Sequence, residues 1–326
     1  MQLITTTGVF TLATAASTKN SSLANTWTVY QTLFTDHLES INAAPSTIRT
    51  YRYAVEQLGA YLHEQNLPTD PRKVKREHIS SWMLHLQRPP EESGRGLAAQ
   101  TALQRFQSTR QFFKFLEEAG DIKESPMLRL KPPRVPEKLV PVIADDDLKK
   151  LFKVVSGTDF ESRRDKAIIS IFVDTGIRVS EMAGLMLNDI DLEQREIEVL
   201  GKGRRPRILR IVRETRTDLL RYLQARSLHP HADSPVLWLG KRERLTDNGI
   251  RQMVRRRQEE AGIPRIHPHV FRHTFAHNYL KGGGSEGDLV RITGWKDRQM
   301  LDRYGASVAA ERARDAHDTF SPRRGF

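Results

Sequence analysis

Cysteine is absent from all 326 residues, so neither a disulfide bond nor a thiolate metal site is available to the chain. No apolar run reaches the length of about 20 residues that a membrane-spanning helix needs. Residues 1–7 lack the basic segment that begins a secretory signal peptide, although residues 13–16 are small, as at a cleavage site. These absences favour a reducing cytoplasm, and we interpret residues 1–24 as a mobile tail.

Acidic residues are too few to balance the basic ones. The chain has 52 Lys and Arg against 40 Asp and Glu, a net charge of +12 and a pI near 10.0. Residues 1–130 hold 14 basic and 12 acidic residues, whereas residues 131–326 hold 38 and 28. Because Lys and Arg neutralise phosphates and release counterions, this excess favours a nucleic-acid partner. Charge alone leaves open a basic protein with no such partner.

Hydrophobic residues recur at helical spacing through residues 25–130, which predicts a small all-helical domain with four helices. In the first helix the buried stripe is expected to contain Val29, Leu33, Phe34 and Leu38. The aromatic residues of the fourth helix are interpreted as core rather than as platforms for stacking bases.

A proline-rich stretch, residues 131–141, follows this domain and is predicted to be a linker, because proline removes amide donors and restricts the preceding residue. Residues 142–326 then alternate helices with short strands. The predicted fold class is mainly α with a small β-sheet (α+β). Helices are expected at about 214–228, 247–261, 268–281, 285–293 and 297–303, with an alanine-rich tail helix at 308–318.

Two of the predicted strands form a basic hairpin. Residues 196–200 alternate like a strand, a Gly-Lys-Gly turn follows, and residues 206–212 form the second strand. Between Lys202 and Arg216 there are seven basic residues and a single acid, Glu214. The charge excess therefore gathers on one turn of the second domain.

Six residues supply what metal-free cleavage of a phosphodiester needs: fixed cations for the charge that spreads over the phosphate, a nucleophile, and groups that accept and give a proton. In chain order they are Arg178, Lys202, His269, Arg272, Trp295 and Tyr304. Each is weak evidence alone. Gly-Lys-Gly turns are common, and the spacing of His269 and Arg272 recurs at His85 and Arg88, to which we assign no chemistry. Order and spacing taken together outweigh these alternatives.

In this order the motifs resemble those of tyrosine recombinases, the phage integrase family of site-specific DNA recombinases. Residues 175–181 resemble the family's first arginine box, residues 201–203 its hairpin lysine, and residues 269–276 its second arginine box. Residues 294–305 match the segment in which a histidine or tryptophan precedes the nucleophile by nine residues. Residues 111–127 resemble the end of the family's core-binding domain. The resemblance implies an N-terminal SAM-like core-binding domain, residues 25–130, and a C-terminal catalytic domain, residues 142–326.

The resemblance also implies roles for the phosphate-binding residues. Tyr304 would attack the scissile phosphorus, giving a 3′-phosphotyrosyl link and a free 5′-hydroxyl without ATP. Arg178 and Arg272 would clamp the non-bridging oxygens with guanidinium groups that stay charged at any working pH.

Proton transfer would fall to other residues. Lys202 resembles the family's general acid for the leaving 5′ oxygen, and His269 would accept the tyrosine proton or hold the phosphate. Trp295 stands where many members have histidine, so one hydrogen-bond donor is kept but a titratable group is lost. Glu181, which could otherwise form an ordinary surface ion pair with the nearby arginine, is expected to brace the basic cluster, and His273 to be structural.

Double-stranded DNA is the predicted partner, bound by a dimer on one site and by a homo-tetramer on two, with no membrane, metal or cofactor involved. Localisation is expected to be cytoplasmic, with the nucleoid. Segment 308–318 is expected to dock on a neighbouring protomer. Seven arginines are predicted DNA contacts, although a solvated face remains the alternative for those on the helix at 247–261. They are Arg204, Arg205, Arg207, Arg251, Arg255, Arg256 and Arg257.

Two other classes of function stay open. One is an enzyme like type IB topoisomerases or hairpin-forming telomere resolvases, which share phosphotyrosine chemistry. The other is a DNA-binding accessory protein with an inactive site. Completeness of the six-residue set argues against the second, and the short segment before residue 25 argues against a resolvase.

Overall fold

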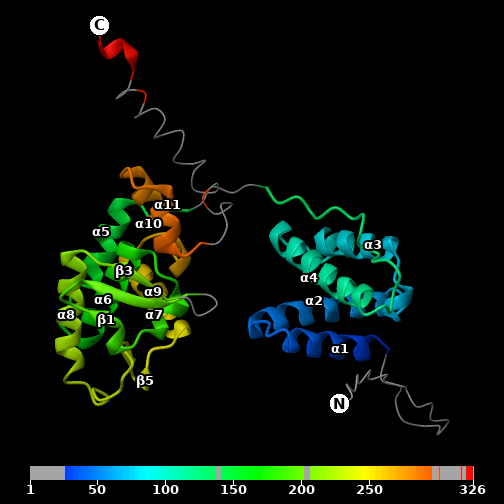
Figure 1. Cartoon of the computed structure of the whole chain (residues 1–326), viewed down its shortest axis with the longest axis horizontal. Helices are drawn as coiled ribbons and strands as arrows, with labels where there is room; N and C mark the ends of the chain where they lie inside the picture. Colours follow the sequence, from blue (N-terminus) through cyan, green and yellow to red (C-terminus); the bar gives the residue numbers. More distant parts are fainter. Residues whose placement is uncertain are drawn as a thin grey trace, which may run out of the picture. The chain divides into compact units, whose positions relative to one another are not determined.

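The computed structural model describes residues 26–136, 141–201, 206–295, 301, 317 and 321–325. The chain divides into two compact units, one ending at Glu137 and the other beginning at Lys138 (Figure 1). We call them the helical unit and the mixed unit. The division falls within the predicted linker, where residues 131–136 form neither helix nor strand.

The helical unit consists of four α-helices and two short 3-10 turns in its described part. They are α1 (Thr26–Ser40), α2 (Pro45–Glu64), η1 (Pro71–Lys73), α3 (Arg76–Gln87), η2 (Pro90–Glu92) and α4 (Ala99–Glu118). Aromatic side chains form the centre of its core: the rings of Phe34 and Phe112 meet edge to face at 5.4 Å, and Trp27 donates its indole N–H to the Val55 carbonyl at 3.1 Å.

The predicted stripe on α1 is half wrong. Phe34 and Leu38 are buried, but Val29 and Leu33 are exposed, and Trp27 and Tyr30 take their places in the core. The buried positions are separated by three or four residues, as one face of a helix requires. Val29 and Leu33 are four residues apart as well, but they lie about 100° away around the helix. The spacing of Val29 and Leu33 therefore resembles that of the core face, although both side chains are exposed.

The mixed unit holds seven described α-helices and two small antiparallel sheets. Its helices are α5 (Asp145–Val154), α6 (Phe160–Thr175), α7 (Val179–Gly184), α8 (Arg213–Arg226), α9 (Asp247–Ala261), α10 (Pro268–Lys281) and α11 (Glu286–Thr293), with 3-10 turns η3 (Leu187–Asp189) and η4 (Pro322–Gly325). Its strands are β1 (Ile190–Asp191), β2 (Glu196–Leu200), β3 (Pro206–Arg210), β4 (Leu239–Gly240) and β5 (Glu243–Arg244). The first sheet has the order β1-β2-β3, and β4 pairs with β5. The predicted fold class, mainly α with a small β-sheet, is confirmed.

Helix α6 forms the centre of the mixed unit. Its middle residues, from Ala167 to Phe172, are buried almost all round, as expected of a helix surrounded by other elements (Figure 1). It packs against α8 and α10, and the rings of Phe172 and Phe271 stack at 5.5 Å. At its end Gly176 adopts φ 58°, and a Cβ there would meet the ring of Phe275 at 2.7 Å. Glycine therefore lets the end of α6 lie directly against α10.

Several predicted elements are confirmed. The basic hairpin is present as β2 and β3, with Leu200 opposite Pro206, and α10 has the predicted bounds. The expected helix at 297–303 lies outside the described residues except for position 301, as does the tail helix except for position 317. No helix in the described ranges is both long and apolar enough to span a bilayer.

Candidate active site

Arg178 is held at the turn that joins α6 to α7. It is the N-cap of α7, where its backbone N–H donates to Glu181 Oε2 at 3.0 Å and its Nη1 donates to Oε1 at 2.8 Å. A second guanidinium nitrogen, Nη2, donates to the Gly294 carbonyl at 3.1 Å. The side chain keeps 29% of its surface exposed. Two contacts thus fix the guanidinium while part of it still faces solvent.

Arg272, on α10, is buried and reaches the same region. Its Nη1 donates to the Gly176 carbonyl at 2.8 Å, and its Nη2 donates to the Thr293 carbonyl. The guanidinium carbon lies 5.4 Å from the centre of the Trp295 ring, a cation–π distance. The two predicted arginine clamps and Trp295 are therefore brought together around the end of α11.

His269 lies one turn before Arg272 on α10. Its ring is edge-on to that of His267, with the centroids 6.2 Å apart. Partial burial lowers the pKa of His269 below its ordinary 6.5, and the positive charges of His267, Arg251, Arg272 and Arg178 lower it further. The imidazole is consequently neutral at neutral pH, the form that accepts a proton.

Glu181 lies between two arginines and is 5% exposed. Besides Arg178, it accepts two hydrogen bonds from Arg207, whose Nη1 and Nη2 reach Oε1 and Oε2 at 2.9 and 2.8 Å. Burial alone would raise the pKa of Glu181, but the hydrogen bonds and charges of Arg207 and Arg178 outweigh it and bring the pKa to about 2. The carboxylate is thus fully charged at any physiological pH.

Two of the predicted catalytic residues are not among those that the structure describes. Lys202 and Tyr304 lie outside the described residues, as do Arg204 and Arg205. Leu301, three positions before the predicted nucleophile, is buried in an apolar cluster that also contains Trp295. His273 is half-buried, and its structural role stays a prediction. Within the described ranges, no group of three or more His, Asp or Glu residues is placed to hold a metal ion.

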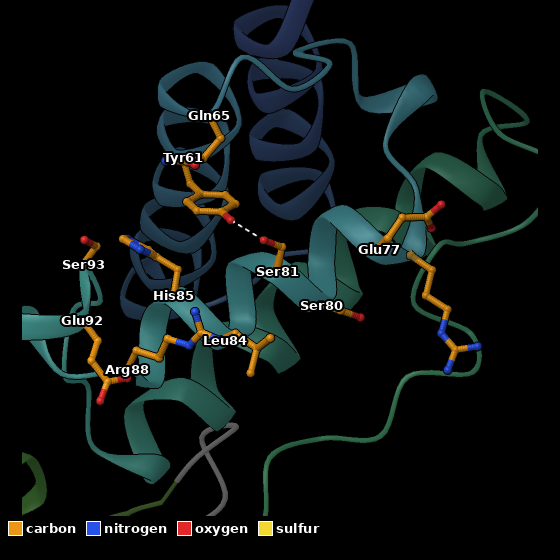
Figure 2. A pocket seen from close by; sticks show the side chains of 11 residues that line it. Tyr61, Gln65, Glu77, Ser80, Ser81, Leu84, His85, Arg88, Glu92 and Ser93 are labelled. Atoms are coloured by element: carbon orange, nitrogen blue, oxygen red, sulfur yellow. Dashed lines mark hydrogen bonds between the residues drawn. The ribbon is translucent and has the colours of Figure 1, made fainter.

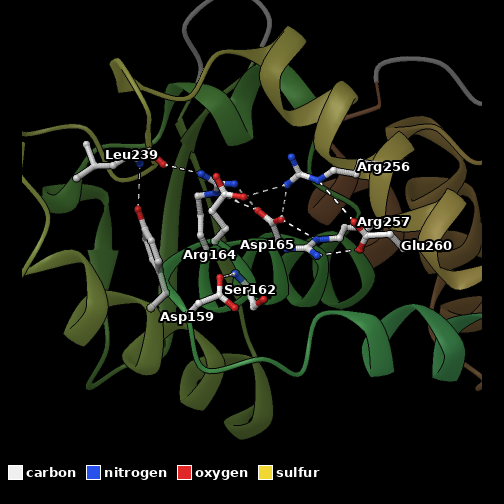
Figure 3. Close-up of polar contacts among 10 residues, drawn as sticks. Asp159, Ser162, Arg164, Asp165, Leu239, Arg256, Arg257 and Glu260 are labelled. Carbon is white, nitrogen blue, oxygen red and sulfur yellow. Dashed lines mark hydrogen bonds and ion pairs between the residues drawn. The ribbon is translucent and has the colours of Figure 1, made fainter.

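Two arginines of α9, Arg256 and Arg257, donate to a buried carboxylate. Asp165, on α6, is completely buried and accepts hydrogen bonds from Arg164 at 2.7 and 2.9 Å, from Arg257 at 2.9 Å and from Arg256 at 3.2 Å (Figure 3). Arg257 is only 11% exposed and also donates to Glu260, so little of it is available to a phosphate. Burying one carboxylate is tolerable only with such partners. The network joins α6 to α9.

The other predicted DNA contacts differ in their surroundings. Arg255 is exposed and pairs with Glu259 at 2.9 Å. Arg251 is exposed, and no ion pair links it to a carboxylate in the described part of the chain. Arg207 is 13% exposed and occupied by Glu181. Contact with DNA stays a prediction for all seven arginines, but the geometry favours Arg251 over Arg207 and Arg257.

An open hollow of about 640 Å³ lies on the helical unit, between α2, α3 and η2 (Figure 2). The hydroxyls of Tyr61 and Ser81 share a hydrogen bond of 2.7 Å, and the ring of His85 lies 5.0 Å from that of Tyr61. Arg88 also lines the hollow. His85 and Arg88 repeat the spacing of His269 and Arg272, but here the histidine packs on the ring of Tyr61.

Comparison with known proteins gives the same family for both units. The model of the phage integrase family matches residues 141–311, and that of the phage integrase N-terminal SAM-like domain matches residues 32–120. The chain is 30% identical over 273 residues to tyrosine recombinase XerC of Thermodesulfovibrio yellowstonii, covering 81% of this chain and 87% of that protein. It is 28% identical over 283 residues to XerD of Listeria innocua, covering 85% and 93%.

Solved structures agree at the level of the fold. The crystal structure of the XerH site-specific recombinase bound to a palindromic difH substrate superposes with a TM-score of 0.69 at 18% identity, covering 87% of this chain and 84% of that one. The first family model alone spans more than half of the sequence. The chain therefore belongs to the phage integrase family of tyrosine recombinases, which are site-specific recombinase enzymes.

Proposed function

We propose that this protein cleaves and rejoins DNA at two short core sites through a 3′-phosphotyrosyl intermediate formed by Tyr304, and so integrates, excises or resolves DNA. The observation that carries the proposal is the meeting of Arg178 and Arg272, from sequence boxes far apart, at adjacent carbonyls beside Trp295. Two fixed guanidinium groups suit the non-bridging oxygens of one phosphate. The solved structures of XerH with its difH substrate and of λ integrase with a COC′ core site support DNA as the partner.

The chemistry follows from the charges at the site. The Tyr304 oxygen bonds to phosphorus as the bond to the 5′ oxygen breaks, while neutral His269 takes the phenolic proton and Lys202 gives one to the 5′ oxygen. The indole N–H of Trp295 adds a donor for the phosphate. Attack of a 5′-hydroxyl on the phosphotyrosine reverses these steps and rejoins the strand. Bond energy is conserved throughout, so ATP is not required, and the two arginines supply the charge stabilisation that a metal ion gives in other phosphoryl-transfer sites.

A nicked suicide duplex made from DNA flanking the encoding gene tests this proposal. The nick lets a short fragment carrying the 5′-hydroxyl diffuse away, so a covalent protein–DNA adduct accumulates. We expect an adduct with the natural protein and none with Tyr304→Phe, while DNA binding of the variant is retained. An adduct that persists in Tyr304→Phe, or binding at the cognate site without any adduct, would overturn the proposal.

The alternatives predicted from the sequence separate in the same experiment. A DNA-binding accessory protein gives no adduct. An enzyme like a type IB topoisomerase or a telomere resolvase gives the adduct but does not join strands from two duplexes. Transfer of a labelled strand from one cognate duplex to another is therefore the result that we expect of a recombinase.

Assembly on DNA is part of the proposal: a dimer on one site and a tetramer on two, acting in the cytoplasm at the nucleoid. A groove of about 610 Å³ in the mixed unit is lined by Asp174 and Glu214, by an ion pair between Asp218 and Lys166, and by Phe275 and Tyr279. Burial raises the pKa of Asp174, because it disfavours the charged carboxylate. A cation entering the groove would stabilise that charge. Segment 308–326 of a second copy suits this groove, because its last eight residues hold two arginines, two phenylalanines and no acid.

Deletion of residues 308–326 tests this assembly. We expect it to weaken pairing of two DNA sites more than binding to a single site, and Glu214→Lys, an exposed change in the groove, to reproduce that effect. Both steps are measured by gel shift on one and on two labelled sites. Equal loss of single-site binding and pairing would exclude the docking.

A further inference from the structure

Arg207 connects three elements of the candidate site. It lies on β3, the second strand of the basic hairpin, and its side chain is largely buried. Two of its guanidinium nitrogens donate to the two oxygens of Glu181 on α7, and its Nε donates to the Ile292 carbonyl on α11 at 2.8 Å. All three donor groups of this side chain are therefore used inside the protein, in a fork that only arginine offers.

The C-terminal end of α11 accepts hydrogen bonds from three arginines of other elements. Its successive carbonyls at Ile292, Thr293 and Gly294 accept from Arg207, Arg272 and Arg178 respectively. The last carbonyls of a helix have no partners within it and carry its partial negative charge, so they attract cations. One helix end thus orients both arginine clamps and the strand beside the hairpin.

Gly294 makes this arrangement possible. It ends α11 with φ 64°, a left-handed conformation that favours glycine, and a Cβ at this position would lie 3.4 Å from Arg207 Nη1. The backbone therefore comes close to the guanidinium group at the point where the three arginines meet.

We propose that Arg207 is a positioning residue that sets the Lys202 hairpin against the arginine clamps, rather than a contact to DNA. The inference rests on the proposed function. Strand β3 begins at Pro206, four residues after Lys202, and its neighbour Arg207 is fixed to the elements that carry Arg178 and Gly294. Without that attachment β3 keeps its ladder to β2, but the hairpin loses its connection to α7 and α11.

Arg207 also shares the carboxylate of Glu181 with Arg178. Arg178 and Arg207 both donate to Oε1, at 2.8 and 2.9 Å, while Oε2 accepts from Arg207 and from the Arg178 backbone. Among the described residues, loss of Arg207 would leave Arg178 as the one guanidinium partner of Glu181. The Glu181 carboxylate would then neutralise an arginine that the phosphate needs. Both effects of losing Arg207 slow cleavage. Release of the Lys202 hairpin acts through the leaving group, whereas neutralisation of Arg178 acts through the non-bridging oxygens.

The leaving group offers the decisive test. A duplex whose scissile 5′ oxygen is replaced by sulfur releases a thiolate, which needs no general acid. With Arg207→Met we expect single-turnover cleavage of the ordinary suicide duplex to fall by about 10–100-fold, as when a catalytic group is misplaced by about 1 Å. On the thiolate-releasing duplex, the cleavage rate of the variant relative to the natural protein should be at least about tenfold higher than on the ordinary duplex. Arg207→Lys, which keeps the charge but not the fork, should behave in the same way.

Arg210→Met is the matched control. Arg210 lies on the same strand, but it is 64% exposed and its ion pair with Glu196 is long, at 4.0 Å. It should leave both cleavage rates unchanged, and circular dichroism melts confirm that each variant is folded. Weaker DNA binding with an unchanged rate at saturating DNA would make Arg207 a DNA contact, and equal loss on both duplexes would exclude an effect on the hairpin; either result overturns the inference. If the natural protein forms no adduct, the proposed function fails first.

Discussion

Two carboxylates of the mixed unit, Asp165 on α6 and Glu181 on α7, hold arginines from distant elements with hydrogen bonds of similar length. Around Asp165 the arginines come from α6 and α9, and the acid itself is wholly buried (Figure 3). Around Glu181 one partner, Arg207, is turned inward, but the other, Arg178, remains partly open to solvent. The two clusters differ in what surrounds the exposed arginine of each. Arg256, 48% exposed, has two further carboxylates nearby, Glu161 at 3.5 Å and Glu260 at 3.9 Å, whereas Glu181 is the one carboxylate paired with Arg178 in the described ranges.

That difference separates a structural network from a binding site. An arginine surrounded by several carboxylates has its charge balanced within the protein, whereas an arginine with one carboxylate partner and an exposed face can take a phosphate. The carboxylate in the open cluster then serves to orient the cation for its ligand. We therefore expect changes at Asp165 to affect stability and changes at Glu181 to affect catalysis.

Asp165→Ala should give the largest effect on stability. It leaves the buried Arg164 without a carboxylate and removes the partner that Arg256 and Arg257 share, which costs about 3–5 kcal/mol. Urea unfolding measures the loss. Asp288→Ala is the control, because Asp288 is exposed and 4.0 Å from Arg291, and it should change stability by no more than about 0.5 kcal/mol. A loss at Asp165 as small as the control's would contradict the structural role.

Glu181→Gln should act mainly on the reaction. The amide keeps the shape of the carboxylate but cannot bind two guanidinium groups by charge, so Arg178 loses its orientation. We expect single-turnover cleavage to fall by about 10–100-fold, with stability at neutral pH lowered by about 1–3 kcal/mol. If instead the rate stays unchanged while stability falls as far as in Asp165→Ala, the two clusters do not differ in kind.

The same substitution changes the response to acid. Because the pKa of Glu181 is lowered in the folded protein from 4.5 to about 2, its stabilising contribution is complete above pH 4.5 and is lost as the pH falls towards 2. In Glu181→Gln this part of the acid sensitivity should be absent, so stability should fall less steeply with decreasing pH across that interval. Urea unfolding at a series of pH values checks it, and an unchanged slope would contradict the assignment.

Much of the fold could be predicted because its signals are local. Helix α10 begins at a proline and ends before glycines, and its predicted bounds are those observed. The hairpin followed from alternating residues around a glycine turn. The stripe on α1 failed because Val29 and Leu33 have the same spacing as core residues, and spacing alone does not say which face is covered.

The site could be predicted only as a set of residues. Arg178, Arg272 and Trp295 are brought together, but the carbonyls of residues 292–294 that orient the arginines are backbone atoms and leave no mark in the sequence. For the same reason Arg207 resembled every other basic residue of its hairpin. Whether an arginine turns inward depends on a partner such as Glu181 or Asp165, which the fold supplies from elsewhere in the chain.

Arginines on one helix give a milder test of the comparison. Arg251 is exposed with no described carboxylate as ion-pair partner, whereas Arg257 belongs to the Asp165 network. Arg251→Gln should therefore lower the slope of log affinity against log salt by about one, the value for one phosphate contact. Arg257→Gln should leave that slope unchanged. Titration of a labelled duplex at several salt concentrations measures both, and equal slopes for the two variants would remove the distinction.

The smallest expected effect concerns the proton acceptor. If neutral His269 takes the tyrosine proton, cleavage falls as the pH drops through its pKa, which burial and the charges of His267, Arg251, Arg272 and Arg178 hold below 6.5. His267→Asn removes one of these charges while keeping a polar side chain, so the acid limb of the pH–rate profile should move up towards 6.5 with the plateau unchanged. His229→Asn is the control: its ring packs on Phe160, at another place in the mixed unit, and the limb should stay where it is. If the acid limb of the pH–rate profile is still present in His269→Asn, the titration belongs to a different group. If the limb does not move in His267→Asn, the two imidazoles are not coupled.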